Sequence, residues 1–131
     1  MLAATNNNTA IGTQALYSNT AAGNTAVGTY VLYANTTGTS NTGVGGYDGS
    51  SQPALRYNTT GKCNVAFGAG ALQNNCTGCN NIGIGFAACG LASGCSNTIT
   101  LGNNQITTIR AQVTSITSLS DCRDKSDICS I

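Results

Sequence analysis

Cysteines are the side chains of this sequence that could most readily do chemistry. The chain has seven cysteines in 131 residues, and Cys76 and Cys79 form a C-x-x-C pair. Such a pair is half of a common zinc site, but the sequence has no second C-x-x-C pair and no histidine to complete four ligands. We therefore predict that the chain holds neither a metal nor a cofactor.

Three of the cysteines are regularly spaced, since Cys63, Cys79 and Cys95 are each 16 residues apart. In a fold that repeats with this period they would lie above one another, at the roughly 4.8 Å separation of hydrogen-bonded strands, and a disulfide tolerates that separation. Disulfides along this column, disulfides between chains and free thiols are all compatible with the spacing. We expect mostly free thiols that line the core.

A second group of distinctive residues lies around the single proline, Pro53. Asp48 and Arg56 are two of only nine charged residues, and they lie at the edges of an extra segment, residues 48–53. Loops on a rigid scaffold often carry recognition, so Asp48, Gln52 and Arg56 are candidates for contact with a surface receptor or glycan. The alternative is that the segment is a bulge that the fold tolerates.

Other residues suggest weaker chemistry. Tyr17 and Tyr33, which are 16 residues apart, could stack on a sugar, but packing on the neighbouring coil is the commoner use of such rings. In a chain this rich in Asn and Thr, N-glycosylation sequons arise by chance and we expect them to be unmodified; they begin at Asn7, Asn35, Asn58 and Asn75. The glycines of residues 43–46 do not form a phosphate-binding loop, and the aspartates are too scattered for a carboxylate pair.

Charge and hydropathy exclude several classes of partner. Only 7% of the residues are charged and the net charge is +1, so the electrostatic attraction that nucleic-acid binding requires is missing. No apolar run approaches the roughly 20 residues that span a bilayer, so we expect no membrane insertion. Residues 1–4 lack the features of a secretory signal. This fits a virion component made in the cytoplasm, and equally a segment of a longer protein.

Short repeats are the elements that must position all these residues. Each repeat has an Asn-Thr pair, a small residue, a β-branched apolar residue and a glycine, as in residues 24–28. The glycines recur at spacings of 16, 17, 23 and 17; they are Gly12, Gly28, Gly45, Gly68 and Gly85. Without the six-residue insertion the spacing of 23 is also 17. Such periods predict an all-β solenoid of short parallel strands with about 16–17 residues per coil.

The repeat also predicts where side chains lie. One asparagine per coil should form an amide ladder, with members Asn8, Asn24, Asn41, Asn64 and Asn81. We expect the apolar residue before each glycine, such as Val27, to lie in the core. That core is too thin for one chain to offset its ordering entropy, so we expect three chains to pack around an axis. The Ala15-Leu16 step could be a second short strand or a helical turn.

The pattern changes near residue 99. Ile109, Ala111 and Val113 alternate with polar residues, which predicts an extended neck strand over residues 99–119. Residues 121–127 then hold five of the nine charges, and this break marks a boundary. The predicted organisation is a repeat shaft over residues 1–98, the neck, and a separate segment over residues 120–131.

Two of these features together resemble a known class of proteins. The Asn-Thr-Ala-Ile/Val-Gly repeats over residues 6–98 resemble the head repeats of trimeric autotransporter adhesins, and still more the fibre proteins of tailed phages and large DNA viruses. Residues 109–121 resemble the neck that precedes the endosialidase-type intramolecular chaperone of such fibres. The chaperone pattern Ser-Asp-x-Arg-x-Lys is matched by Ser120, Asp121, Arg123 and Lys125.

The resemblance implies a homotrimer and a self-cleaving chaperone, with Ser120 as nucleophile and Lys125 as base for cleavage after Leu119. A lysine with a lowered pKa can deprotonate a serine hydroxyl without histidine. Residues 120–131 would be only the start of that chaperone, so autocleavage is expected only in an intact parent and not in this chain. We expect a non-enzymatic structural or adhesive viral fibre on the virion surface. The alternatives are an extracellular filament that grows end to end, a bacterial surface adhesin, and a precursor with Ser-Lys autoproteolysis.

Overall fold

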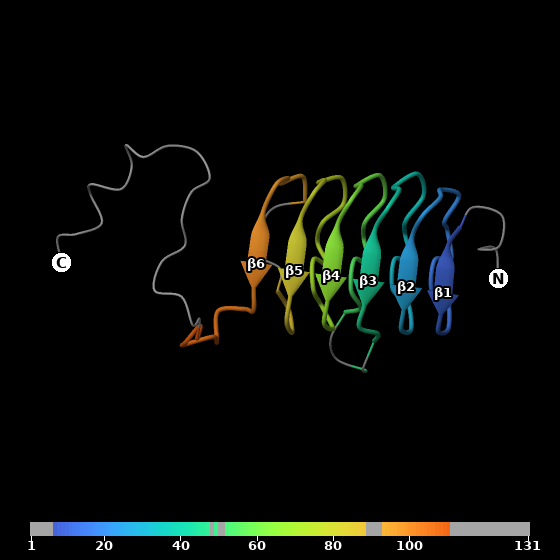
Figure 1. Ribbon diagram of the computed structural model, residues 1–131. Coiled ribbons are helices and arrows are strands. Elements are labelled where there is room, and N and C mark those ends of the chain that lie inside the picture. The colour runs from blue at the N-terminus through green and yellow to red at the C-terminus, as the bar shows by residue number, and fades with distance from the viewer. Residues whose placement is uncertain (1–6, 48, 50–51, 89–92, 111–131) are drawn as a thin grey trace, which may run out of the picture.

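The fold is a parallel β-solenoid. The computed structural model describes residues 7–47, 49, 52–88 and 93–110. Six strands of three residues lie side by side in one parallel sheet, in the order in which they occur in the chain (Figure 1). They are β1 (Thr9–Ile11), β2 (Thr25–Val27), β3 (Thr42–Val44), β4 (Val65–Phe67), β5 (Ile82–Ile84) and β6 (Ile99–Leu101). Among the described residues no helix is long and apolar enough to cross a membrane.

The register confirms the predicted coil length. Paired residues in successive strands are 16, 17, 23, 17 and 17 positions apart, beginning with Thr9 opposite Thr25 and ending with Ile82 opposite Ile99. Side chains outside the insertion therefore have equivalents in the neighbouring coils, and equivalent side chains form columns along the solenoid. At about 4.8 Å per strand, β1 and β6 are about 24 Å apart.

The interior is narrow and is filled mainly by small residues. The middle residue of each strand points inward, and Ala26, Ala66 and Gly83 are buried at this position. The facing wall is a turn that contributes a column of leucines: Leu16, Leu32, Leu55 and Leu72. These leucines have φ between 48° and 55°, so the Ala-Leu step is neither a strand nor a helical turn but a turn in the left-handed region.

Two asparagine ladders close the coils. The predicted ladder is confirmed: the backbone N–H of Asn24, Asn41, Asn64 and Asn81 donates to the side-chain Oδ1 of the asparagine one coil earlier, at 2.7–3.0 Å. A second ladder, made by Asn19, Asn35, Asn58 and Asn75, joins side chain to side chain at 2.6–3.3 Å. The side-chain amides also satisfy buried backbone carbonyls, such as that of Gly38, which accepts from both Asn24 and Asn35.

The predicted core position of the strand apolar residues is wrong. The inner place in each three-residue strand belongs to Ala, Gly or Thr, so the residues on both sides of it point outward. The side chain before each glycine therefore lies on the outer face: Val27 is only half-buried, and Ile11, Phe67, Ile84 and Leu101 are about half exposed. Because strand side chains alternate, one residue per strand faces in and two face out.

The insertion leaves and re-enters the coil at one turn. The backbone N–H of Ala54 donates to the Gly45 carbonyl at 2.9 Å, just as that of Ala71 donates to Gly68 at 3.1 Å in a coil without an insertion. Of the predicted neck, residues 99–101 form β6, and residues 102–110 have no strand. Residues 111–119 lie outside the described part of the chain.

Candidate functional site

Tyrosines gather on the turns that precede and follow the insertion. Tyr17 and Tyr33 stack as expected, with ring centroids 5.1 Å apart and planes inclined by 7°. Tyr33 also contacts Tyr30 at 5.6 Å, and Tyr30 meets Tyr47 edge-on at 6.3 Å. Offset stacked and edge-on pairs at these distances are favourable arrangements of aromatic rings. The rings therefore form one continuous aromatic surface across three coils.

Arg56 places a positive charge within this aromatic surface. Arg56 occupies the position in its coil that Tyr17 and Tyr33 occupy in theirs. Its guanidinium carbon lies 5.4 Å from the ring centroid of Tyr30, 5.8 Å from that of Tyr33 and 5.6 Å from that of Tyr57. All three distances fall within the range of cation–π attraction. The rings position the guanidinium without using its N–H groups, and those groups can donate to a ligand.

Gln52 brings an unsatisfied acceptor to the same place. Its side-chain Oε1 is buried and accepts no hydrogen bond from the residues that the structure describes. A buried amide oxygen without a donor costs about 1–3 kcal/mol. Tyr47, by contrast, already donates its hydroxyl hydrogen to the Gly49 carbonyl at 3.0 Å.

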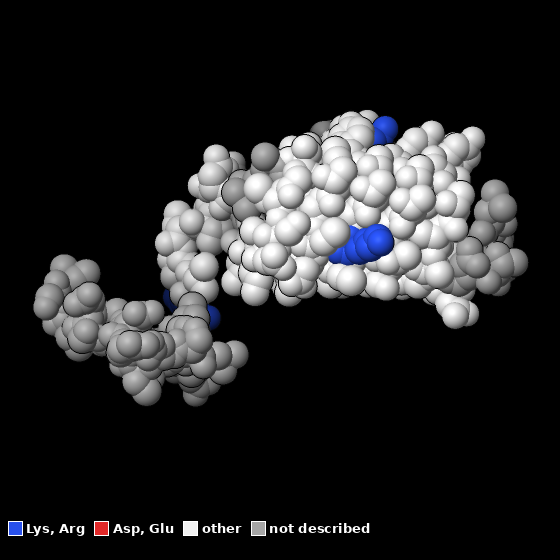
Figure 2. Space-filling view, turned by 90° about the horizontal axis from the view of Figure 1, so that it is seen from above, with Lys and Arg blue, Asp and Glu red and all other residues white. Residues whose placement is uncertain are grey.

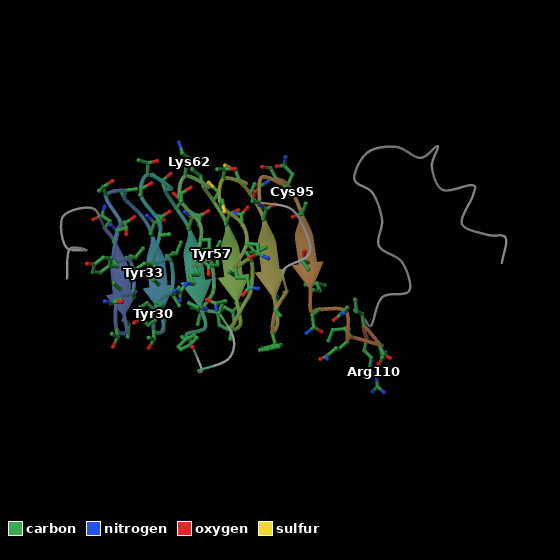
Figure 3. The ribbon with its side chains drawn as sticks, turned by 180° about the vertical axis from the view of Figure 1, so that it is seen from behind. Tyr30, Tyr33, Tyr57, Lys62, Cys95 and Arg110 are labelled. Carbon is green, nitrogen blue, oxygen red and sulfur yellow. The ribbon has the colours of Figure 1, made fainter. Side chains whose placement is uncertain are left out.

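These side chains line an open groove of about 420 Å³. Its lining consists of four tyrosines, two glutamines and one arginine: Tyr30, Tyr33, Tyr47, Tyr57, Gln14, Gln52 and Arg56. Figure 3, the view from behind the sheet, shows Tyr30 and Tyr33 on one turn and Tyr57 on the next. The volume falls in the range of small-molecule sites, and amphipathic rings with a few convergent polar groups are what such sites use.

The structure brings together some of the residues singled out in the sequence and leaves others untested. Gln52 and Arg56 lie in the same groove. Asp48, Ser120 and Lys125 lie outside the described residues, so neither the third member of the predicted receptor loop nor the cleavage pair is placed. Sequence reasoning missed Tyr30, Tyr47 and Tyr57. Alignment of the coils could have found Tyr30 and Tyr47, because each lies two residues after a repeat glycine, Gly28 or Gly45.

The cysteine column is a wrong prediction. From β3 onward, and leaving the insertion aside, equivalent residues are separated by 17 positions. Cysteines spaced by 16 residues are therefore not equivalent: each lies one position away from the equivalent of the one before. Cys79 accordingly lies between Lys62 and Ser96: it accepts from the Lys62 backbone N–H at 3.3 Å, and its own N–H donates to Ser96 Oγ at 2.9 Å. The described cysteines Cys63, Cys76, Cys79 and Cys95 are free thiols on or near the surface, and they do not line the core.

Among the described residues, no three His, Cys, Asp or Glu side chains lie together in a way that could hold a metal ion. Three sequon asparagines have structural roles, since Asn35, Asn58 and Asn75 belong to the second ladder. They are 0%, 0% and 6% exposed, and their Nδ2 atoms are occupied by hydrogen bonds. Glycosylation at these three positions is incompatible with the fold, whereas Asn7 is exposed.

The rest of the surface carries little charge. The charged residues in the described part of the chain are Arg56, Lys62 and Arg110, and Figure 2 shows isolated basic side chains on an otherwise uncharged face.

No family model, no curated protein and no solved structure matches this chain.

Proposed function

We propose that the chain is a structural segment of a fibre, and that it assembles with copies of itself through the outer face of the sheet. The observation that carries the proposal is a pair of outward columns on β1 to β6. One column is apolar throughout and consists of Ile11, Val27, Val44, Phe67, Ile84 and Leu101. The other changes from threonine to Val65, Ile82 and Ile99 in the later strands.

Exposure of these side chains favours a protein partner. Phe67 is 56% exposed, Ile84 47% and Ile99 69%. Large continuous apolar patches on soluble proteins mark interaction surfaces. A single thin solenoid buries little apolar area, so burial of this face adds the stabilisation that one chain lacks.

A second copy of the chain fits this face better than an unrelated partner does. Apolar side chains recur on it once per coil, at the roughly 4.8 Å spacing of the strands. Another copy presents the same spacing, and a closed symmetric arrangement matches each coil with its equivalent. The number three comes from the resemblance of the repeats to those of trimeric fibres.

A surface location is the remaining part of the proposal. The resemblance of the repeats and of residues 109–125 to viral fibres supports a role as a shaft that projects from a virion and contacts a host. The gene sequence beyond the codon for Ile131 tests this part. A chaperone of the endosialidase type is expected there, and a stop codon would favour a standalone filament.

Light scattering coupled to size-exclusion chromatography tests the assembly. A discrete trimer is expected for the chain, and the double variant Phe67→Thr/Ile84→Thr should shift it toward a monomer while keeping strand-forming residues. Tyr57→Thr is the matched control, because it removes an exposed aromatic ring from a turn and not from the sheet. A folded monomer for the unchanged chain would refute the trimer, and a polymer that grows with concentration would replace it with a filament.

A further inference from the structure

The groove around Arg56 has a composition that its structural role does not require. Four of the five tyrosines in the chain line it, and they surround one of only three described charged residues. Close packing of the solenoid needs no such cluster, because the equivalent turn further along carries Gly70, Gln73 and Asn74 in place of Tyr47, Arg56 and Tyr57.

Arg56 is the group that sets the charge of a ligand. The described residues include no Asp or Glu, so no described carboxylate neutralises its guanidinium. Ring faces at 5.4–5.8 Å hold the cation in place without using its in-plane N–H donors. A fixed guanidinium with free donors matches a planar carboxylate, which it can bind through two parallel hydrogen bonds.

The remaining lining determines the rest of the ligand. Tyrosine rings present flat apolar surfaces with a polar tip, and the face of a pyranose ring that carries C–H groups packs on such a surface. Gln52 also lines the groove, and its Oε1 lacks a donor. Because that oxygen is buried, the side-chain amide must turn toward the groove to accept from a sugar hydroxyl. Gln14, which also lines the groove, adds further amide donors and an acceptor.

We propose that this groove binds a saccharide that carries a carboxylate, of the uronic acid type. The carboxylate pairs with Arg56, the sugar ring packs on the tyrosines, and a ring hydroxyl donates to Gln52. The inference deepens the proposed fibre role by naming the class of host-surface ligand, and it rests on that role only for its biological use. Asp48, which lies outside the described residues, takes no part in the argument.

Methyl β-D-glucuronide and methyl β-D-glucoside form a matched pair of probes, because they differ only at C6, which is a carboxylate in the first and a hydroxymethyl group in the second. Saturation-transfer NMR should detect the glucuronide, with ring protons close to protein and a Kd on the order of 1 mM, as expected for one sugar ring. The glucoside should bind about tenfold more weakly or not measurably. Arg56→Gln should abolish this preference, and Gln52→Leu should weaken both sugars.

Two control variants separate the site from general effects of charge and folding. Lys62→Gln removes an exposed cation from another turn and should leave glucuronide binding unchanged. Arg56→Lys keeps the positive charge but loses the two parallel N–H donors of the guanidinium, so it should retain only part of the affinity for the glucuronide. Circular dichroism and thermal melting of each variant establish that it is folded before binding is compared.

Three results would overturn the proposal: no binding of the glucuronide at tens of millimolar, equal binding of the two probes, or binding that Arg56→Gln does not change. None of these depends on oligomeric state. A folded monomer that binds the glucuronide refutes the trimer and retains the groove, whereas a trimer that binds neither sugar refutes the groove alone.

Discussion

The backbone N–H of Asn41 donates to the side-chain Oδ1 of Asn24 one coil earlier, at a distance of 2.9 Å. The Asn24 side chain also donates from Nδ2 to the Gly38 carbonyl at 2.9 Å, so one buried amide satisfies a donor and an acceptor that belong to different coils. Coils this short have few buried apolar groups. Satisfaction of their buried backbone therefore contributes strongly to the stability of the solenoid.

Replacement of Asn64 by alanine should destabilise the fold strongly. Its Oδ1 accepts from the Asn81 backbone N–H at 3.0 Å, and its Nδ2 donates to the Gly78 carbonyl at 2.8 Å. Asn64→Ala leaves the Asn81 N–H buried without an acceptor and opens a cavity. We expect a loss of roughly 2–4 kcal/mol in the free energy of unfolding, measured by denaturant titration.

Asn74→Ala is the matched control in the same coil. The Asn74 side chain is exposed and belongs to neither ladder, so its replacement should change the free energy of unfolding by less than about 0.5 kcal/mol. Equal effects of the two substitutions would show that the ladders contribute nothing beyond ordinary side-chain packing.

Gly68→Ala should also be severely destabilising, for a backbone reason. Gly68 has a φ of 127°, and a Cβ there would lie 2.5 Å from the Gly85 carbonyl oxygen. Side chains rarely tolerate this φ, and a backbone neighbour cannot move aside, so we expect a loss of roughly 2–4 kcal/mol or failure to fold.

The same substitution two residues later provides the comparison. Gly70 has a φ of 75°, and the equivalent positions in other coils hold Gln14 and Tyr30 with positive φ. Gly70→Ala should therefore cost only about 1 kcal/mol. Thermal melting of the two variants decides, and a Gly68→Ala variant as stable as Gly70→Ala would contradict the explanation.

The sequence allowed prediction of the coil length, the first asparagine ladder and the Tyr17–Tyr33 stack, because all three depend only on the period. It did not allow prediction of which strand residues face inward. In a segment such as Thr25-Ala26-Val27 the inner and outer residues are both compatible with burial, so alternation gives no contrast between polar and apolar residues.

The groove and the cysteine positions were harder to predict for a different reason. Both depend on which residues of successive coils are equivalent. A change of one residue in the length of a coil alters this register. Cys63, Cys79 and Cys95 lost their apparent column because equivalent residues in these later coils are 17 positions apart. Tyr47 and Arg56 are separated in the chain by the insertion, and the pairing of β3 with β4 places them in one coil.

Val31 and Gly43 form a compensating pair in the core, and this relationship can be tested by a double-mutant cycle. Val31 is larger than its equivalents Ala15, Ala54 and Ala71, and a Cβ on Gly43 would lie 2.6 Å from Val31 Cγ1. Gly43→Ala should cost about 1–3 kcal/mol through overpacking. In the Val31→Ala background the same change should cost at least about 1 kcal/mol less, as measured by denaturant unfolding.

A distant core substitution is the control for this cycle. Leu72→Ala lies two coils away and should add to Gly43→Ala within about 0.5 kcal/mol. If the effects of Gly43→Ala and Val31→Ala on the free energy of unfolding are also additive, the coil relaxes around the extra methyl group. Val31 would then not be the reason that position 43 is a glycine.

Deletion of residues 48–53 should leave the solenoid intact. The insertion lies within a turn that is closed by the hydrogen bond from the Ala54 N–H to the Gly45 carbonyl. Its removal joins Tyr47 directly to Ala54, and the equivalent residues Tyr30 and Val31 are joined directly in the coil before. Since loop length has a small effect on stability, we expect the free energy of unfolding to change by about 1 kcal/mol or less. Thermal melting and light scattering should show a cooperative fold with an unchanged oligomeric state.

The same deletion separates the scaffold from the groove. It removes Gln52 but keeps Arg56 and all four lining tyrosines on their own coils, so glucuronide binding should weaken while folding persists. A variant that fails to fold would show that the insertion supports the scaffold, in which the fully buried Pro53 would be the contributing residue. A variant that folds and binds the sugar as tightly as the full chain would remove Gln52, and the insertion with it, from the recognition surface.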